Sequence, residues 1–181
     1  TNMLDQINFK GHKFPAFQAT GNAARFIIPF AVEVCRGFGV DVGCNRAEWA
    51  LPGAFPIDPA LEGVNMEFVD GWTVIHEEWH ATQFPNFPRK LDFIFSSHCL
   101  EHIENPWSAL DYWHSQLTLG GILFLYLPDI SQVYWRPWHN RKHIHCLTPE
   151  ILRAYLVDKG FQKIHISGID LNNSFAVIAE R

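Results

Sequence analysis

Two short, almost continuously apolar runs lie on either side of a segment with helical spacing, and this arrangement most constrains the fold. The runs are Leu91–Ser97 and Ile122–Leu127, and each has the length of a strand that is buried on both faces. Between them, Asn105-Pro106 supplies a helix cap and a first helical residue, and Gly120-Gly121 is expected to end the helix. A strand, a helix and a second strand in this order predict a parallel pair joined by a right-handed crossover.

Strands and helices alternate along the rest of the chain as well. Helices are expected at 22–36, capped by Asn22, and at 148–160, where Gly160 provides the stop. Strands are expected at 37–43, 54–58, 163–169 and 174–180, with one more near 72–76. The sequence therefore predicts an α/β chain with a doubly wound, mostly parallel sheet, a C-terminal antiparallel hairpin, and helices on both faces.

Size and composition narrow the class of protein. A chain of 181 residues that is 48% hydrophobic suits one compact domain over 1–181. The net charge is −5 and no basic run exceeds Arg141-Lys142, which argues against bulk nucleic acid as a partner. No apolar run approaches the roughly 20 residues of a spanning helix, so no membrane partner is expected.

The spacing of the cysteines and the composition of the amino end both indicate the cellular compartment of the protein. The four cysteines stand far apart in the sequence and form no close-spaced framework of the secreted kind, which predicts a reducing, cytoplasmic location. Residues 1–10 contain scattered polar and charged residues where a signal peptide would need an apolar block, so export is not expected.

Two features at strand ends point to a nucleotide-like ligand. The stretch Val40–Asn45 places Gly43 in the turn after the first strand, where backbone can approach a ligand closely. Asp58 ends the next strand 17 positions after Asp41, near the spacing at which an acid accepts hydrogen bonds from ribose hydroxyls. Taken alone, these two features fit an ordinary tight turn and an exposed strand-end aspartate equally well.

A third block gives the pattern a family resemblance. The stretches Leu91–Ile103, Asn105-Pro106 and Leu119–Asp129, taken with the first-strand turn and Asp58, closely resemble the class I S-adenosylmethionine-dependent methyltransferases, in particular the type 11 group. The resemblance is continuous from Val40 to Asp129 and implies a Rossmann-like fold. Two positions depart from the family pattern, because Asn45 stands at a usual glycine and His80 at a usual aspartate.

The resemblance implies S-adenosylmethionine as the methyl donor and S-adenosylhomocysteine as the product. It assigns 37–129 to the donor-binding core, after an N-terminal segment and helix over 1–36. Asp58 would hold the ribose, and His80 with Ala81 would lie beside the adenine. The segment after the fourth strand, including Glu101, would form the wall near the methionine part. The full set of implied donor-binding residues is Asp41, Gly43, Cys44, Asn45, Asp58, His80, Ala81, Ser97, His98 and Leu100.

The segment 130–147 is the candidate acceptor loop, followed by the C-terminal helix and hairpin over 148–181. Methyl transfer is an in-line displacement at an activated carbon, so the protein mainly aligns the two substrates and excludes water. If the acceptor must lose a proton, the nearest candidate bases are Asp129, His139, His143 and His145. The expected acceptor is a small molecule or a glycan, by analogy of fold.

Two segments that contain aromatic residues have two interpretations each. Tyr134, Trp135 and Trp138 either line an acceptor pocket or form a lid on the core. The run Phe17–Asn22 either folds over the donor or simply leads into the first helix.

Two other functions compete with methyl transfer. The pattern His98, Glu101, His102 matches an inverted zincin motif on a helix, with a third zinc ligand drawn from His139, His143 or His145. The main prediction includes no metal. A domain that binds the donor without transferring methyl groups is the other alternative, suggested by Asn45 at the glycine position.

Overall fold

The central feature of the computed structural model, which describes residues 6–9, 12–15, 22–67 and 73–181, is a six-stranded sheet. Its order is β4 (Phe55–Ile57), β3 (Gly39–Val42), β7 (Leu91–Ser97), β8 (Leu117–Pro128), β10 (Ser174–Glu180) and β9 (Gln162–Ile166). The first four strands are parallel, and β10 runs antiparallel to both of its neighbours. The predicted mostly parallel sheet with a C-terminal antiparallel hairpin is confirmed.

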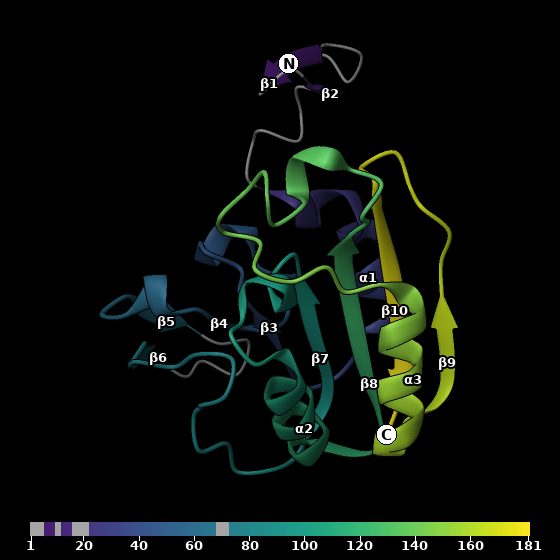
Figure 1. Ribbon diagram of the computed structural model, residues 1–181. Helices are drawn as coiled ribbons and strands as arrows, with labels where there is room; N and C mark the ends of the chain where they lie inside the picture. Colours follow the sequence, from purple (N-terminus) through teal and green to yellow (C-terminus); the bar gives the residue numbers. More distant parts are fainter. Residues whose placement is uncertain (1–5, 10–11, 16–21, 68–72) are drawn as a thin grey trace.

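Both faces of the sheet are covered, which explains why its central strands read as continuous apolar runs. Side chains alternate along β7, so that Phe93 and Phe95 pack on one face while Ile94 packs on the other. Helix α1 (Ile28–Val34) lies against the first face, and α2 (Pro106–Gln116) and α3 (Pro149–Lys159) lie against the second (Figure 1).

The ends of α2 and α3 follow the cap chemistry of the sequence. The side chains of Asn105 and Thr148 accept hydrogen bonds from the first-turn N–H groups of Ser108 and Ile151, and a proline follows each cap. Gly160 ends α3 in the left-handed conformation, as predicted. Among the described residues, no helix is long and apolar enough to cross a membrane.

Two predicted helix boundaries are wrong. The segment 22–36 contains a 3₁₀ helix, Ala23–Phe26, followed by the short α1, because Pro29 can only begin an α-helix; Asn22 makes no capping bond. The second error concerns α2, which ends at Gln116 rather than at Gly120-Gly121. Both glycines lie inside β8, where the register against β7 shifts and Gly120 adopts a φ of +79°.

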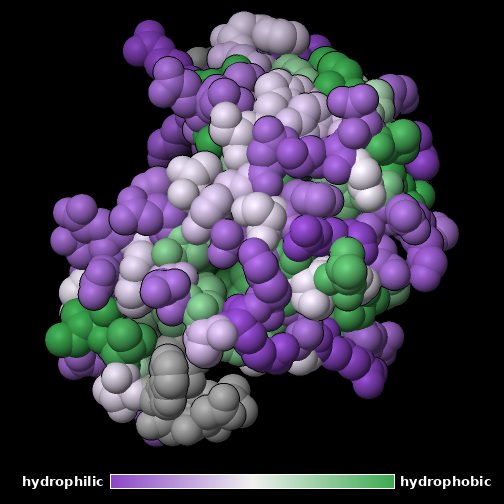
Figure 2. All heavy atoms as spheres, turned by 90° about the horizontal axis from the view of Figure 1, so that it is seen from below, coloured by the Kyte–Doolittle hydropathy of each residue, from purple (hydrophilic) through white to green (hydrophobic). Residues whose placement is uncertain are grey.

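Two smaller hairpins flank the central sheet. The strand expected near 72–76 is β6 (Thr73–Ile75), but it pairs with the unpredicted β5 (Asn65–Glu67) in a separate sheet. Near the amino end, β1 (Gln6–Phe9) pairs with β2 (His12–Pro15), and β2 lies next to the 3₁₀ helix Val133–Trp135. At the opposite end of the molecule, seen in Figure 2, hydrophobic patches are separated by hydrophilic side chains.

Candidate functional site

The site lies at the carboxyl ends of the parallel strands, which point toward the top of Figure 1. From β3 the chain passes to β4 on one side and later to β7 on the other, so the strand order reverses between β3 and β7. In open α/β sheets a reversal of this kind leaves a crevice at the strand ends, and ligands bind there. The turns after β3, β4 and β7 and the loop 130–147 surround this position (Figure 1).

The turn after β3 needs two residues with left-handed backbone. Gly43 has a φ of +85°, and a Cβ at this position would lie 2.4 Å from the Cys99 sulfur, so only glycine fits. Asn45 has a φ of +64°. Because asparagine tolerates this conformation better than most residues, it substitutes for the second glycine of the family pattern without changing the backbone that the turn requires. The neighbouring Cys44 is buried.

Asp41 is a scaffold residue in this structure. Its carboxylate is 2% exposed and accepts a 2.7 Å hydrogen bond from the Leu51 N–H, which closes the segment 44–51 over the strand end. Burial raises the pKa of Asp41 to about 7; the bond from Leu51 opposes this shift and the nearby Asp58 charge adds to it. The structure therefore places its carboxylate beneath the turn.

Asp58 is half-buried at the end of β4 and fixes the turns around it. One oxygen accepts a 2.7 Å hydrogen bond from the Asn45 N–H, and the other accepts a 2.9 Å bond from the Ala60 N–H. Each carboxylate oxygen can accept a second bond, so both keep capacity for ribose hydroxyls. His76, which was not singled out from the sequence, is 1% exposed and places Nε2 3.5 Å from the Asp58 backbone nitrogen.

The predicted adenine-side residues form a small turn against α2. His80 and Gln83 exchange two backbone hydrogen bonds, and the Ala81 carbonyl accepts a 2.6 Å bond from the Trp113 indole. This anchoring fixes the turn to a side chain buried in the core. Of the run Phe17–Asn22, residues 17–21 lie outside the described residues.

The end of β7 carries several buried polar atoms. Ser97 Oγ is buried without a hydrogen-bond partner. His98 has a φ of +47°, and its Nε2 lies 2.9 Å from the Ser174 hydroxyl. Burial lowers the pKa of His98 to about 3, with smaller contributions from His143 and His102, so the ring is neutral at physiological pH. Leu100 is a core residue, 1% exposed.

The inverted zincin geometry is wrong for this chain. It requires His98 and His102 on one face of an α-helix, but only a 3₁₀ turn, Leu100–His102, forms after the kink at His98. The His98 ring instead contacts Tyr126 and Trp135, at centroid distances of 5.3 and 4.8 Å. The hydrolase alternative therefore loses its structural basis.

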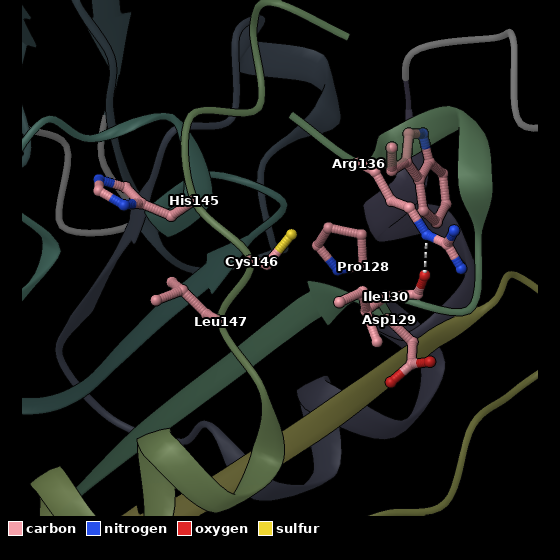
Figure 3. Close-up of a pocket in the computed structure, with 8 residues that line it drawn as sticks. Pro128, Asp129, Ile130, Arg136, His145, Cys146 and Leu147 are labelled. Atoms are coloured by element: carbon pink, nitrogen blue, oxygen red, sulfur yellow. Dashed lines mark hydrogen bonds between the residues drawn. The ribbon is translucent and has the colours of Figure 1, made fainter. Parts of the chain in front are cut away.

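Asp129 and His145 line a small hollow between the end of β8 and the loop (Figure 3). Its volume is about 10 Å³, which is room for about one water molecule. Asp129 is 8% exposed and accepts a 2.9 Å bond from the Ser131 N–H. Arg136 closes the hollow and donates a 2.7 Å bond to the Ile130 carbonyl.

The other candidates from the loop lie in different places. His139 contacts Trp138, which is 64% exposed, whereas His143 is 6% exposed and contacts His102. Trp135 is 7% exposed and covers His98 edge-on, which matches the lid interpretation. Tyr134 is half-buried, and its N–H donates to the Gln132 side chain. The sequence grouped these bases together, but the structure divides them among three sites.

The described sheet, its strand order and the turns at its carboxyl end define a Rossmann-like α/β fold. The methyltransferase domain family model matches residues 19–166, and the chain therefore belongs to the methyltransferase domain family. Its resemblance to the S-adenosylmethionine-dependent enzymes is confirmed. The chain is an enzyme of that kind, with S-adenosylmethionine as its cofactor.

Solved structures support the fold. A SAM-dependent methyltransferase from Archaeoglobus fulgidus is 20% identical, with a TM-score of 0.62, over 91% of this chain and 94% of that one. A possible histamine N-methyltransferase from Thermotoga maritima is 15% identical, with a TM-score of 0.62, over 91% and 97%. An N-methyltransferase from Bradyrhizobium japonicum is 14% identical, with a TM-score of 0.57, over 87% and 93%. No curated protein matches the sequence significantly.

Proposed function

We propose that this methyltransferase binds its donor across the ends of β3, β4 and β7 and methylates a small-molecule or glycan acceptor beside the loop 130–147. The observation that carries the proposal is the reversal of strand order between β3 and β7, with Gly43 and Asp58 at the resulting strand ends. We further propose that residues 1–181 form one domain in a reducing, cytoplasmic compartment, which the four free cysteines support.

The side-chain contacts in the proposal use atoms with bonding capacity left. Asp58 accepts hydrogen bonds from the ribose hydroxyls through its remaining lone pairs. Ser97 Oγ, buried and without a partner, bonds to the methionine part. The backbone of Gly43 and Asn45 approaches the donor closely, and the turn at His80 and Ala81 lies beside the adenine.

Acceptor binding in the proposal depends on movement of the loop. The hollow at Asp129 and His145 has room for about one water molecule, so an acceptor displaces Arg136 and its neighbours when it enters. Asp129, His139 and His143 remain the proposed bases for an acceptor that must lose a proton. Among them, Asp129 lines the hollow itself.

Titration calorimetry tests the donor site with S-adenosylhomocysteine and its 2′-deoxy analogue. The wild-type protein should bind the ribose form at least about 10-fold more tightly, because a lost hydrogen bond to a charged group costs about 1.5–3 kcal/mol. Asp58→Asn should lose most of this preference while keeping an acceptor for the Asn45 N–H.

Asp158→Asn, an exposed change on α3, is the matched control and should bind both ligands as the wild type does. Equal discrimination by the wild type and Asp58→Asn would show that Asp58 only supports the turn. A wild-type protein that binds neither ligand would refute the proposed donor site.

A further inference from the structure

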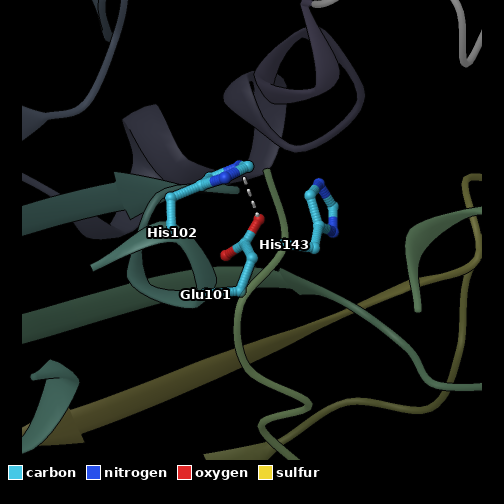
Figure 4. A group of neighbouring side chains, drawn as sticks. All are labelled: Glu101, His102 and His143. Carbon is cyan, nitrogen blue, oxygen red and sulfur yellow. Dashed lines mark ion pairs between the residues drawn. The ribbon is translucent and has the colours of Figure 1, made fainter. Parts of the chain in front are cut away.

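Three side chains from two separate segments meet beside the end of β7. Glu101 and His102 belong to the 3₁₀ turn after that strand, and His143 belongs to the loop 130–147. One ligand atom from each lies within 4.8 Å of the other two (Figure 4). His102 Nε2 lies 3.5 Å from a Glu101 carboxylate oxygen.

The loop is fixed to the turn by backbone hydrogen bonds. The N–H groups of Ile144 and His145 both donate to the Glu101 carbonyl, at 3.0 and 3.2 Å. The His145 ring bonds to the Glu104 carbonyl at 3.0 Å. These contacts position His143 next to Glu101 without any bond between their side chains, so the cluster is held by the surrounding backbone.

Buried polar atoms in this cluster lack partners. Glu101 is 1% exposed, and neither of its carboxylate oxygens has a hydrogen bond. His143 Nδ1 is also buried and unpartnered. Most buried polar side-chain atoms in proteins are paired, and an unpaired one costs about 1–3 kcal/mol. The unpartnered atoms belong to two of the three clustered side chains, and a bound cation would supply the partner that they lack.

The histidines present free lone pairs to that point. His102 Nδ1 bonds to the Lys142 carbonyl, so it carries the proton and leaves Nε2 unprotonated on the Glu101 side. A ring nitrogen bonded to a backbone carbonyl is the usual support of a metal-binding histidine. His143 Nδ1 has no hydrogen-bond partner and is therefore free to bind a ligand.

We propose that Glu101, His102 and His143 bind a divalent transition-metal ion, with Zn²⁺ as the preferred occupant. Two imidazoles and one carboxylate, with one coordination position left open, are a ligand set typical of zinc. Ligands on one zinc ion at about 2.1 Å lie roughly 3.4 Å apart. His102 and Glu101 already have nearly this separation, and a ligand atom of His143 lies within 4.8 Å of both.

This site differs from the inverted zincin pattern, because His143 replaces His98, and it departs from the expectation that the chain holds no metal. The ion would link the loop 130–147 to the end of β7. The site shares His143 with the proposed bases, but metal binding itself is testable without either substrate.

Metal binding is measured on metal-free protein without a histidine tag, by calorimetry with Zn²⁺ and by visible absorption with Co²⁺. The wild type should bind one equivalent of Zn²⁺ with micromolar or tighter affinity and give a Co²⁺ spectrum of low coordination number. Glu101→Gln, His102→Asn and His143→Asn should each weaken Zn²⁺ binding by at least about 10-fold and remove that spectrum.

His165→Asn is the matched control, because it removes an exposed imidazole from the edge strand β9, outside the cluster. It should bind Zn²⁺ within about 2-fold of the wild type. Circular dichroism and thermal unfolding show whether each variant is folded. The proposal is overturned if the wild type binds no Zn²⁺, or if folded Glu101→Gln and His143→Asn both bind it as tightly as the wild type.

Discussion

The turns after β3 and β4 differ from the turn after β7 in how their polar groups are satisfied. In the first region, the carboxylates of Asp41 and Asp58 together accept three backbone hydrogen bonds. The donor N–H groups lie between 2 and 13 positions away along the chain. In the second, Ser97, Glu101 and His143 keep buried polar atoms without partners. The difference teaches that the turns of the first region hold their own conformation before any ligand binds, whereas the second region keeps buried polar atoms that the protein itself leaves unpaired.

The largest expected difference in stability is between substitutions of two tryptophans in the loop 130–147. Trp135→Ala should lower the free energy of unfolding by about 3 kcal/mol, because it removes a buried ring that covers His98. Trp138→Ala, at a site that is 64% exposed, should change it by less than about 0.5 kcal/mol. Urea denaturation measures both, and similar losses would contradict the assignment of Trp135 as the lid.

A second contrast tests how tightly the first region is packed. Gly43→Ala should destabilise the protein by about 2–4 kcal/mol, since it combines a left-handed backbone with a Cβ 2.4 Å from the Cys99 sulfur. Gly53→Ala has a similar φ of +82° but nothing within 4 Å, and should cost about 1 kcal/mol. Thermal unfolding compares the two; equal costs would mean that the contact with Cys99 is unimportant.

The pH dependence of stability tests the burial of Asp41. Its folded pKa, about 7, lies above its ordinary value of 3.8, so the folded state holds this proton more tightly than the unfolded state. Its contribution is therefore full below about pH 4 and is lost as the pH rises toward 7, by at most about 1.4 kcal/mol per pH unit.

Asp41→Asn removes that titration and keeps an oxygen for the Leu51 N–H. The difference in unfolding free energy between the variant and the wild type should therefore grow in favour of the variant from pH 4 to pH 7. Denaturation at several pH values gives this difference directly, and a constant difference would show that Asp41 is ionised in the folded protein throughout.

The smallest effect is expected at Asn45. Asn45→Ala should cost about 1 kcal/mol, because alanine is strained at a φ of +64°, whereas Asn45→Gly should be neutral within a few tenths. Chemical denaturation resolves this difference. If Asn45→Gly also weakens S-adenosylhomocysteine binding, the asparagine side chain has a role beyond backbone conformation.

Much of the fold was predictable because its signals are local. The apolar runs of β7 and β8, the caps Asn105 and Thr148, and the stop at Gly160 each depend on neighbours within a few residues. The errors arose where tertiary contacts override these signals. Gly120-Gly121 resemble a helix stop, yet pairing with β7 draws them into β8 and uses them for a shift of register.

The sequence by itself determined the order of strands and helices, the turn at Gly43 and the acid at the end of β4, since these depend on backbone geometry at adjacent positions. Only the tertiary structure decided which histidines meet. His98 and His102 are four residues apart but diverge at a left-handed kink, while His143, 41 positions beyond His102, is brought to Glu101 by two backbone hydrogen bonds. Spacing along a chain predicts proximity only within a regular element, and contacts between loops depend on how the whole sheet is packed.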